Sequence, residues 1–179
     1  MQRWLGRLAI IGMVAGGLLG VSHQAARAGR PETTESNSPE SDLAIVVNTT
    51  NPVENLTLPE LRKVFLGERS HWPNGRRITL VMMEPGQPER RALIREVCQM
   101  TESDFTRHFL QGVFTGEVFV SPKTLASPVG VRKFVFNVPG AIGYVRASDV
   151  DSSVKVIRVD GRLPDDKDYG LRIPLRAAQ

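Results

Sequence analysis

Residues 43–65 read LAIVVNTTNPVENLTLPELRKVF, and this stretch contains the unit that decides the fold. It opens with a continuous apolar run rich in β-branched residues, which is typical of a strand covered on both faces. A polar loop follows, and then Thr57 and Glu60 have the spacing of a helix capping box. The helix that they begin has four apolar residues on one face: Leu58, Leu61, Val64 and Phe65. The stretch predicts a buried strand, a loop and an amphipathic helix.

The same alternation of strands and helices continues toward the C-terminus. Apolar runs bounded by turn residues predict further strands at 78–83, 139–145 and 154–159. Helical spacing with capping residues predicts further helices at 88–100, 101–112 and 128–137. This order favours the α/β class, with helices packed on a central sheet.

The N-terminal 28 residues have the composition of a signal peptide. Arg3 and Arg7 precede the apolar stretch 8–20, and Ala26-Arg27-Ala28 has the small-x-small pattern of a cleavage site. The apolar stretch is shorter than the roughly 20 residues that a spanning helix needs. We therefore expect residues 1–28 to direct secretion to the periplasm and to be cleaved off, leaving no membrane span.

The segment 29–41, GRPETTESNSPES, has no large apolar residue. A segment of this composition cannot bury enough surface to order itself, so it is interpreted as a flexible leader. The folded domain is expected to span 42–179. Its single cysteine, Cys98, cannot form an internal disulfide and is predicted to be a buried apolar residue on a helix.

The charge of the chain lies largely in the export signal. Cleavage removes three of the 23 Lys and Arg residues and none of the 19 Asp and Glu residues, so the mature chain is nearly neutral. Nucleic-acid binding requires a clustered excess of basic residues, and we expect no nucleic-acid partner. The sequence also has no HExxH, GxSxG or Walker motif. We therefore expect neither an enzyme nor a bound metal or cofactor.

Three segments then resemble a known family. LPELRKVFLGERSHWPNG at 58–75 is similar to the helix, "IFxG" segment and Trp turn of phosphate-type periplasmic solute-binding proteins of ABC importers. FTGEVFVSPK at 114–123 and VPGAIGYV at 138–145 resemble their "FTG" loop and "PGAIGY" turn, in the same order. The resemblance implies a type II periplasmic-binding-protein-like fold. Because a complete receptor has two lobes, and this chain is long enough for about one, a single lobe is expected.

The loop MEPGQPERRAL at 83–93 is where the chain departs from that family. The family's phosphate loop carries an Arg, an Asp two residues later, and then a Ser-Gly-Thr triplet that opens a helix. The aligned residues here are Met83, Pro85, Gln87, Pro88 and Glu89, and only the Gly86 turn is retained. Pro88 has no N–H to donate, and Glu89 places a carboxylate where phosphate would lie.

Two functions follow from the resemblance, and the sequence leaves both open. In the first, the lobe binds phosphate or another small oxyanion weakly or with a partner, through residues beside the strand at 43–48 and in the loop: Thr49, Thr50, Gly86, Gln87, Arg90 and Arg91. In the second, the lobe has lost the phosphate site and is an interaction domain that recognises another envelope protein.

Overall fold

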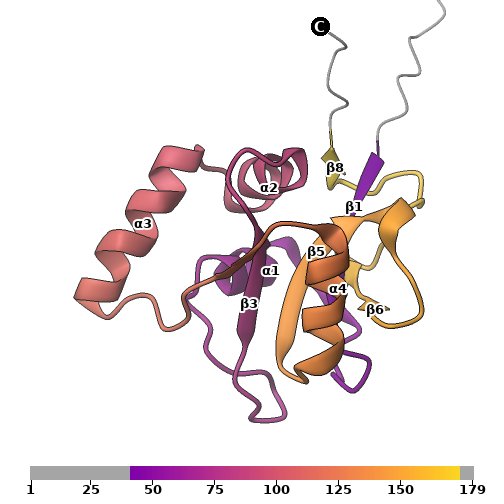
Figure 1. Cartoon of the computed structure of the whole chain (residues 1–179), viewed down its shortest axis with the longest axis horizontal. Coiled ribbons are helices and arrows are strands. Elements are labelled where there is room, and N and C mark those ends of the chain that lie inside the picture. The colour runs from indigo at the N-terminus through magenta and orange to yellow at the C-terminus, as the bar shows by residue number, and fades with distance from the viewer. Residues whose placement is uncertain (1–40, 174–179) are drawn as a thin grey trace, which may run out of the picture. The chain divides into compact units, whose positions relative to one another are not determined.

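The computed structural model describes residues 41–173. The predicted signal peptide at 1–28 lies outside these residues, as does the predicted leader at 29–41 apart from Ser41. The described residues form a main six-stranded sheet with the order β4-β3-β5-β1-β6, and β8 also pairs with β1 (Figure 1). Its strands are β1 (Ser41–Val47), β3 (Thr79–Met83), β4 (Lys123–Leu125), β5 (Ala141–Arg146), β6 (Lys155–Val156) and β8 (Arg172–Ile173).

The directions of the central strands fix which loops can meet. Strand β3 is parallel to β4 and β5, whereas β1 is antiparallel to β5, with Leu43 opposite Arg146 and Val47 opposite Ile142. The carboxyl ends of β3 and β5 therefore lie along the same edge of the sheet, where edge means the line of strand ends and not an outermost strand. The carboxyl end of β1 lies along the opposite edge. Since β1 has seven residues, these edges are roughly 20 Å apart.

Helices cover both faces of this sheet, and the α/β class is confirmed. Figure 1 shows α4 in front of the sheet and α1 behind it. The helical segments are α1 (Leu58–Phe65), α2 (Pro88–Leu93), the π-helix η1 (Ile94–Cys98), α3 (Glu102–Thr115), α4 (Pro128–Asn137) and the 3-10 turn η2 (Ala147–Asp149). The predicted capping box begins α1: the Thr57 amide donates to the Glu60 carboxylate at 2.9 Å, and the Thr57 hydroxyl accepts from the Glu60 amide.

Two helices differ from the sequence prediction in where they end. The helix expected at 88–100 becomes a π-helix at Ile94 and ends at Cys98, because Gln99 has a left-handed backbone with φ 55°. The helix expected to end at Gly112 continues to Thr115. A Cβ on Gly112 would lie 2.3 Å from the Val118 side chain, so this glycine allows a close approach within the helix and does not stop it.

The strand expected at 154–159 is also different, because it divides into two short strands. Strand β6 pairs with the end of β1, and β7 (Arg158–Val159) pairs in parallel with β2 (Asn55–Leu56) in a second, two-stranded sheet. Between them, the Ile157 amide donates to the Ile45 carbonyl at 3.0 Å. The chain thus passes from one sheet to the other over a single residue.

The core lies between the sheet and its helices. Strand β5 is buried from Ala141 to Val145. Cys98 is fully buried, as predicted, and burial raises the pKa of its thiol to about 12. Trp72 is also buried, and its Nε1 donates to the Gly140 carbonyl at 2.9 Å, which holds the turn at 71–75 against the start of β5.

Candidate anion-binding loop

The segment between β3 and α2 forms an exposed turn at the carboxyl edge of the sheet. Glu84, Pro85 and Gly86 are exposed, and the Gln87 amide donates back to the Glu84 carbonyl at 3.4 Å. Gly86 has φ 89°, a left-handed conformation that favours glycine, and a Cβ added there would touch nothing. The backbone of the turn thus requires this glycine even though its surroundings are open.

Several hydrogen-bond donors of this loop and of the start of α2 have no partner within residues 41–173. They include the Gly86 amide, the Gln87 side-chain amide and the Arg91 guanidinium. Gly86 and Arg91 are exposed to solvent, and Gln87 is half-buried. Helix α2 begins at Pro88, which contributes no N–H at the first helical position. The loop therefore offers a small set of donors to an anion.

Arg90 is not one of these donors, because its guanidinium is bound inside the protein. The residue is only 6% exposed, and Nη1 donates to the Met83 carbonyl at 3.0 Å. Its Nε and Nη2 lie 2.8 and 2.7 Å from Oε1 of Glu102, and its charge lies over the Phe105 ring. Arg90 thus ties the end of β3 to the start of α3.

Glu89 is buried beside it and makes an ion pair with Arg146, the last residue of β5. The Glu89 carboxylate thus neutralises the Arg146 cation near the start of α2. Sequence reasoning missed Arg146, which is 57 residues from Glu89. Arg146 could have been found only from the pairing of β3 with β5, because two parallel strands place their last residues at the same edge of the sheet.

A buried tyrosine supports the strand that leads into the loop. The Tyr144 hydroxyl accepts a hydrogen bond from the Met83 amide at 3.0 Å. A side chain of β5 therefore fixes the position of the last residue of β3. Burial raises the pKa of Tyr144, and the hydroxyl stays protonated at neutral pH. This contact fixes the point at which the loop leaves the sheet.

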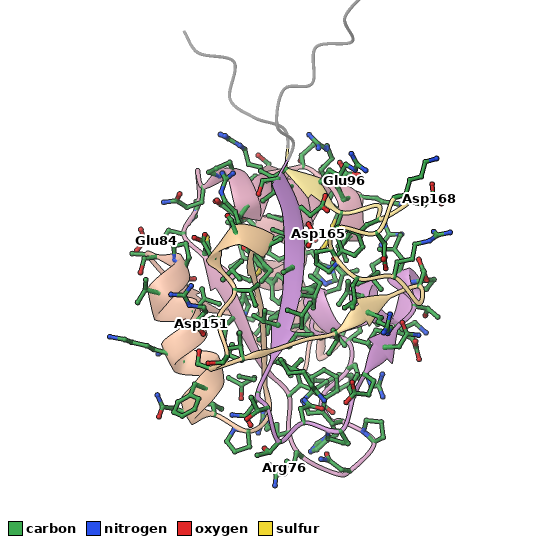
Figure 2. The ribbon with its side chains drawn as sticks, turned by 90° about the vertical axis from the view of Figure 1, so that its right-hand side faces the viewer. Arg76, Glu84, Glu96, Asp151, Asp165 and Asp168 are labelled. Carbon is green, nitrogen blue, oxygen red and sulfur yellow. The ribbon has the colours of Figure 1, made fainter. Side chains whose placement is uncertain are left out.

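Thr49 and Thr50 lie at the opposite edge, after the carboxyl end of β1. The Thr50 hydroxyl donates to the Asn48 side-chain oxygen at 2.7 Å and accepts from Arg76 at 3.4 Å. Asn48 is buried, and its amide nitrogen donates to the Val135 and Phe136 carbonyls near the end of α4. In Figure 2, Arg76 marks this lower edge, and Glu84, at the start of the candidate loop, is far above it.

The structure therefore brings four of the six predicted site residues together and leaves two apart. Gly86, Gln87, Arg90 and Arg91 share the turn and the start of α2, whereas Thr49 and Thr50 belong to the other edge. Within residues 41–173 there is no group of three or more His, Cys, Asp or Glu side chains that could hold a metal ion. In the same part of the chain, no helix combines the length and the apolar character needed to cross a membrane.

Comparison with known proteins places this loop in a wider context. No family model matches the chain. The phosphate-binding protein PstS of Bacillus subtilis (strain 168) is 28% identical over 130 residues, which are 70% of this chain and 38% of that protein. The sequence resemblance is confirmed. The chain is related to the phosphate-type solute-binding proteins.

Solved structures of such proteins have the same fold. An ABC-type phosphate transport receptor from Vibrio cholerae matches with a TM-score of 0.58 and 23% identity, over 70% of this chain and 48% of the receptor. A putative phosphate ABC transporter substrate-binding protein from Clostridium perfringens, solved with bound phosphate, matches with a TM-score of 0.56 and 25% identity, over 68% and 46% of the two chains. The chain thus spans less than half the length of these relatives and has the fold of a single lobe of the periplasmic-binding-protein type.

Proposed function

We propose that this chain is a periplasmic solute-binding lobe that holds phosphate or another small oxyanion, weakly or with a partner, at the loop between β3 and α2. The observation that supports this proposal is the set of unused donors on Gly86, Gln87 and Arg91. Charge-assisted hydrogen bonds from such groups suit an oxyanion. In this proposal the lobe is a binding protein for transport and not an enzyme, and it works after export through its signal peptide.

Weak affinity follows from the charges around the loop. Arg90 and Arg146 are paired with Glu102 and Glu89, so Arg91 is the unpaired cation of the α2 start. An ion pair between exposed groups contributes only about 0 to 1 kcal/mol, because water screens it. The buried carboxylate of Glu89 also repels a second anion nearby.

A partner that covers the loop would raise this affinity. The Gly86 amide and the Arg91 guanidinium face solvent, and an electrostatic interaction strengthens severalfold when water is excluded from it. The two-lobed relatives suggest that a second lobe is a suitable cover, and another envelope protein would serve equally. Thr49 and Thr50 lie at the wrong edge of the sheet to contribute to this loop.

Thermal unfolding of the purified protein with a panel of oxyanions tests the proposal. We expect phosphate or a related anion at millimolar concentration to raise the Tm, and Arg91→Ala to abolish the increase. Arg95→Ala is the matched control, because Arg95 is an exposed arginine one turn along that pairs with Glu96. A Tm increase that persists in the Arg91→Ala variant would contradict the proposed site. No response to any oxyanion would favour the other hypothesis, an interaction domain that has lost the phosphate site.

A further inference from the structure

A cavity of about 370 Å³ lies between α2 and the start of α3. Its walls include Pro88, Arg91, Ala92, Arg95, Met100 and Thr101. The volume is in the range of roughly 300 to 1,000 Å³ that is typical of small-molecule sites. Since a water molecule occupies about 30 Å³ of the liquid, an inorganic oxyanion bound here would leave most of the cavity to solvent.

The turn between η1 and α3 builds this cavity. Gln99 has a left-handed backbone with φ 55°, and the Met100 amide donates to the Ile94 carbonyl at 3.2 Å, so the chain reverses direction there. The ion pair of Arg90 and Glu102 then ties the start of α3 to α2, and Figure 1 shows the two elements side by side. The cavity thus lies between two elements that are fixed relative to each other.

The cavity combines an apolar wall with a cation that faces solvent. Ala92 and the half-buried side chain of Met100 contribute the apolar wall. Arg91 is exposed and has no ion-pair partner among residues 41–173. Arg95 is paired with Glu96 at 2.6 Å, so it contributes the alkyl part of its side chain more than a free charge. A ligand that matches both features has an apolar body and an anionic group.

We propose that the cavity binds the apolar body of a phosphate monoester, while Arg91 binds its phosphate group. This inference rests on the proposed function, because Arg91 is also the cation of the loop between β3 and α2. A monoester keeps three phosphate oxygens free to accept hydrogen bonds. Glu102 also lines the cavity, but its carboxylate is compensated by Arg90 at 2.7 Å, so Arg91 leaves the site positive.

NMR titration of the purified protein with inorganic phosphate, phenyl phosphate and phenol tests this inference. We expect phenyl phosphate to bind about tenfold more tightly than inorganic phosphate, because part of its ring is removed from water. Phenol lacks the charge and should bind more weakly than phenyl phosphate, and Arg91→Ala should remove that difference. Equal affinities for phosphate and phenyl phosphate would overturn the inference and leave the proposed function standing. No binding of either anion would contradict the proposed function itself.

Met100→Gln tests the apolar wall separately. The substitution keeps a side chain of similar length and replaces the thioether by an amide. We expect phenyl phosphate to lose most of its tenfold advantage, while the affinity for inorganic phosphate stays unchanged. Leu110→Gln is the control, since Leu110 is 63% exposed on α3 and does not line the cavity. Circular dichroism verifies that both variants are folded. A folded Met100→Gln variant that keeps the full advantage would overturn the placement of the ring in this cavity.

Discussion

Glu89 and Arg90 are neighbours in the sequence, but their side chains connect different parts of the fold. Glu89 pairs with Arg146 at the end of β5, and Arg90 pairs with Glu102 at the start of α3. Each buried charge is therefore compensated by a residue of another element, 57 residues away for Glu89 and 12 residues away for Arg90. These two pairs hold the candidate loop in place. They also neutralise the guanidinium groups of Arg90 and Arg146, which would otherwise attract an anion.

The pair of Glu89 and Arg146 gives a prediction at the residue scale. Glu89→Gln is expected to lower the free energy of unfolding by about 1 to 3 kcal/mol, less than a fully buried pair, because the Arg146 side chain keeps 26% of its exposure. The same change removes the competing carboxylate and frees Arg146. We therefore expect Glu89→Gln to increase the Tm shift produced by oxyanions.

Urea denaturation measures the change in the free energy of unfolding, and thermal unfolding with the oxyanion panel measures the increase in the Tm shift. Glu96→Gln is the control, because Glu96 forms an exposed pair with Arg95 and its loss should change stability by less than about 0.5 kcal/mol. A destabilised Glu89→Gln variant whose Tm is no more sensitive to oxyanions than the unmodified protein would show that Arg146 does not reach the anion.

At the scale of single elements, local signals predicted the start of a helix better than its end. Thr57 and Glu60 located the start of α1, because a capping box depends only on residues three apart. The end of α3 could not be found in this way, since Gly112 is there for its contact with Val118, which depends on the folded loop. Arg146 was missed for the same reason: its role depends on strand order.

The capping box of α1 gives a prediction at this scale. Thr57→Ala removes the side-chain acceptor for the Glu60 amide, and we expect a loss of about 1 kcal/mol in the free energy of unfolding. Hydrogen bonds from Thr57 also lower the pKa of Glu60 in the folded protein. Because the folded pKa is below the unfolded value, this contribution is present at neutral pH and is lost as the pH falls through the folded pKa.

Denaturation at pH 7 and at acidic pH measures both effects. The stability difference between the unmodified protein and Thr57→Ala should be largest at neutral pH and should shrink on acidification. Glu54→Ala is a useful comparison, because Glu54 is an exposed acid whose contact, the Lys155 ammonium, lies outside any helix cap. An equal difference at both pH values would mean that the hydrogen bond from the Thr57 hydroxyl to the Glu60 carboxylate does not contribute to the cap.

At the scale of the whole described lobe, the directions of the strands determine whether the six candidate site residues can form one binding site. The sequence predicted the α/β class, since alternation of strands and helices is visible along the chain. It did not predict the strand directions, and these separate Thr49 and Thr50 from the loop at Gly86. Two loops that both follow buried strands look equivalent in the sequence but lie at opposite edges.

This separation predicts that the two edges act independently. Thr50→Ala removes one hydrogen bond to Asn48 and is expected to cost about 1 kcal/mol of stability, while leaving the Tm response to oxyanions unchanged. Arg91→Ala should leave the stability nearly unchanged and abolish the Tm response to oxyanions. In the double variant the stability changes should add to within about 0.5 kcal/mol, as for distant sites without shared contacts. If Thr50→Ala reduced the oxyanion response as strongly as Arg91→Ala, the anion would have to bind at the Thr50 and Arg76 edge, and the loop between β3 and α2 would lose its role.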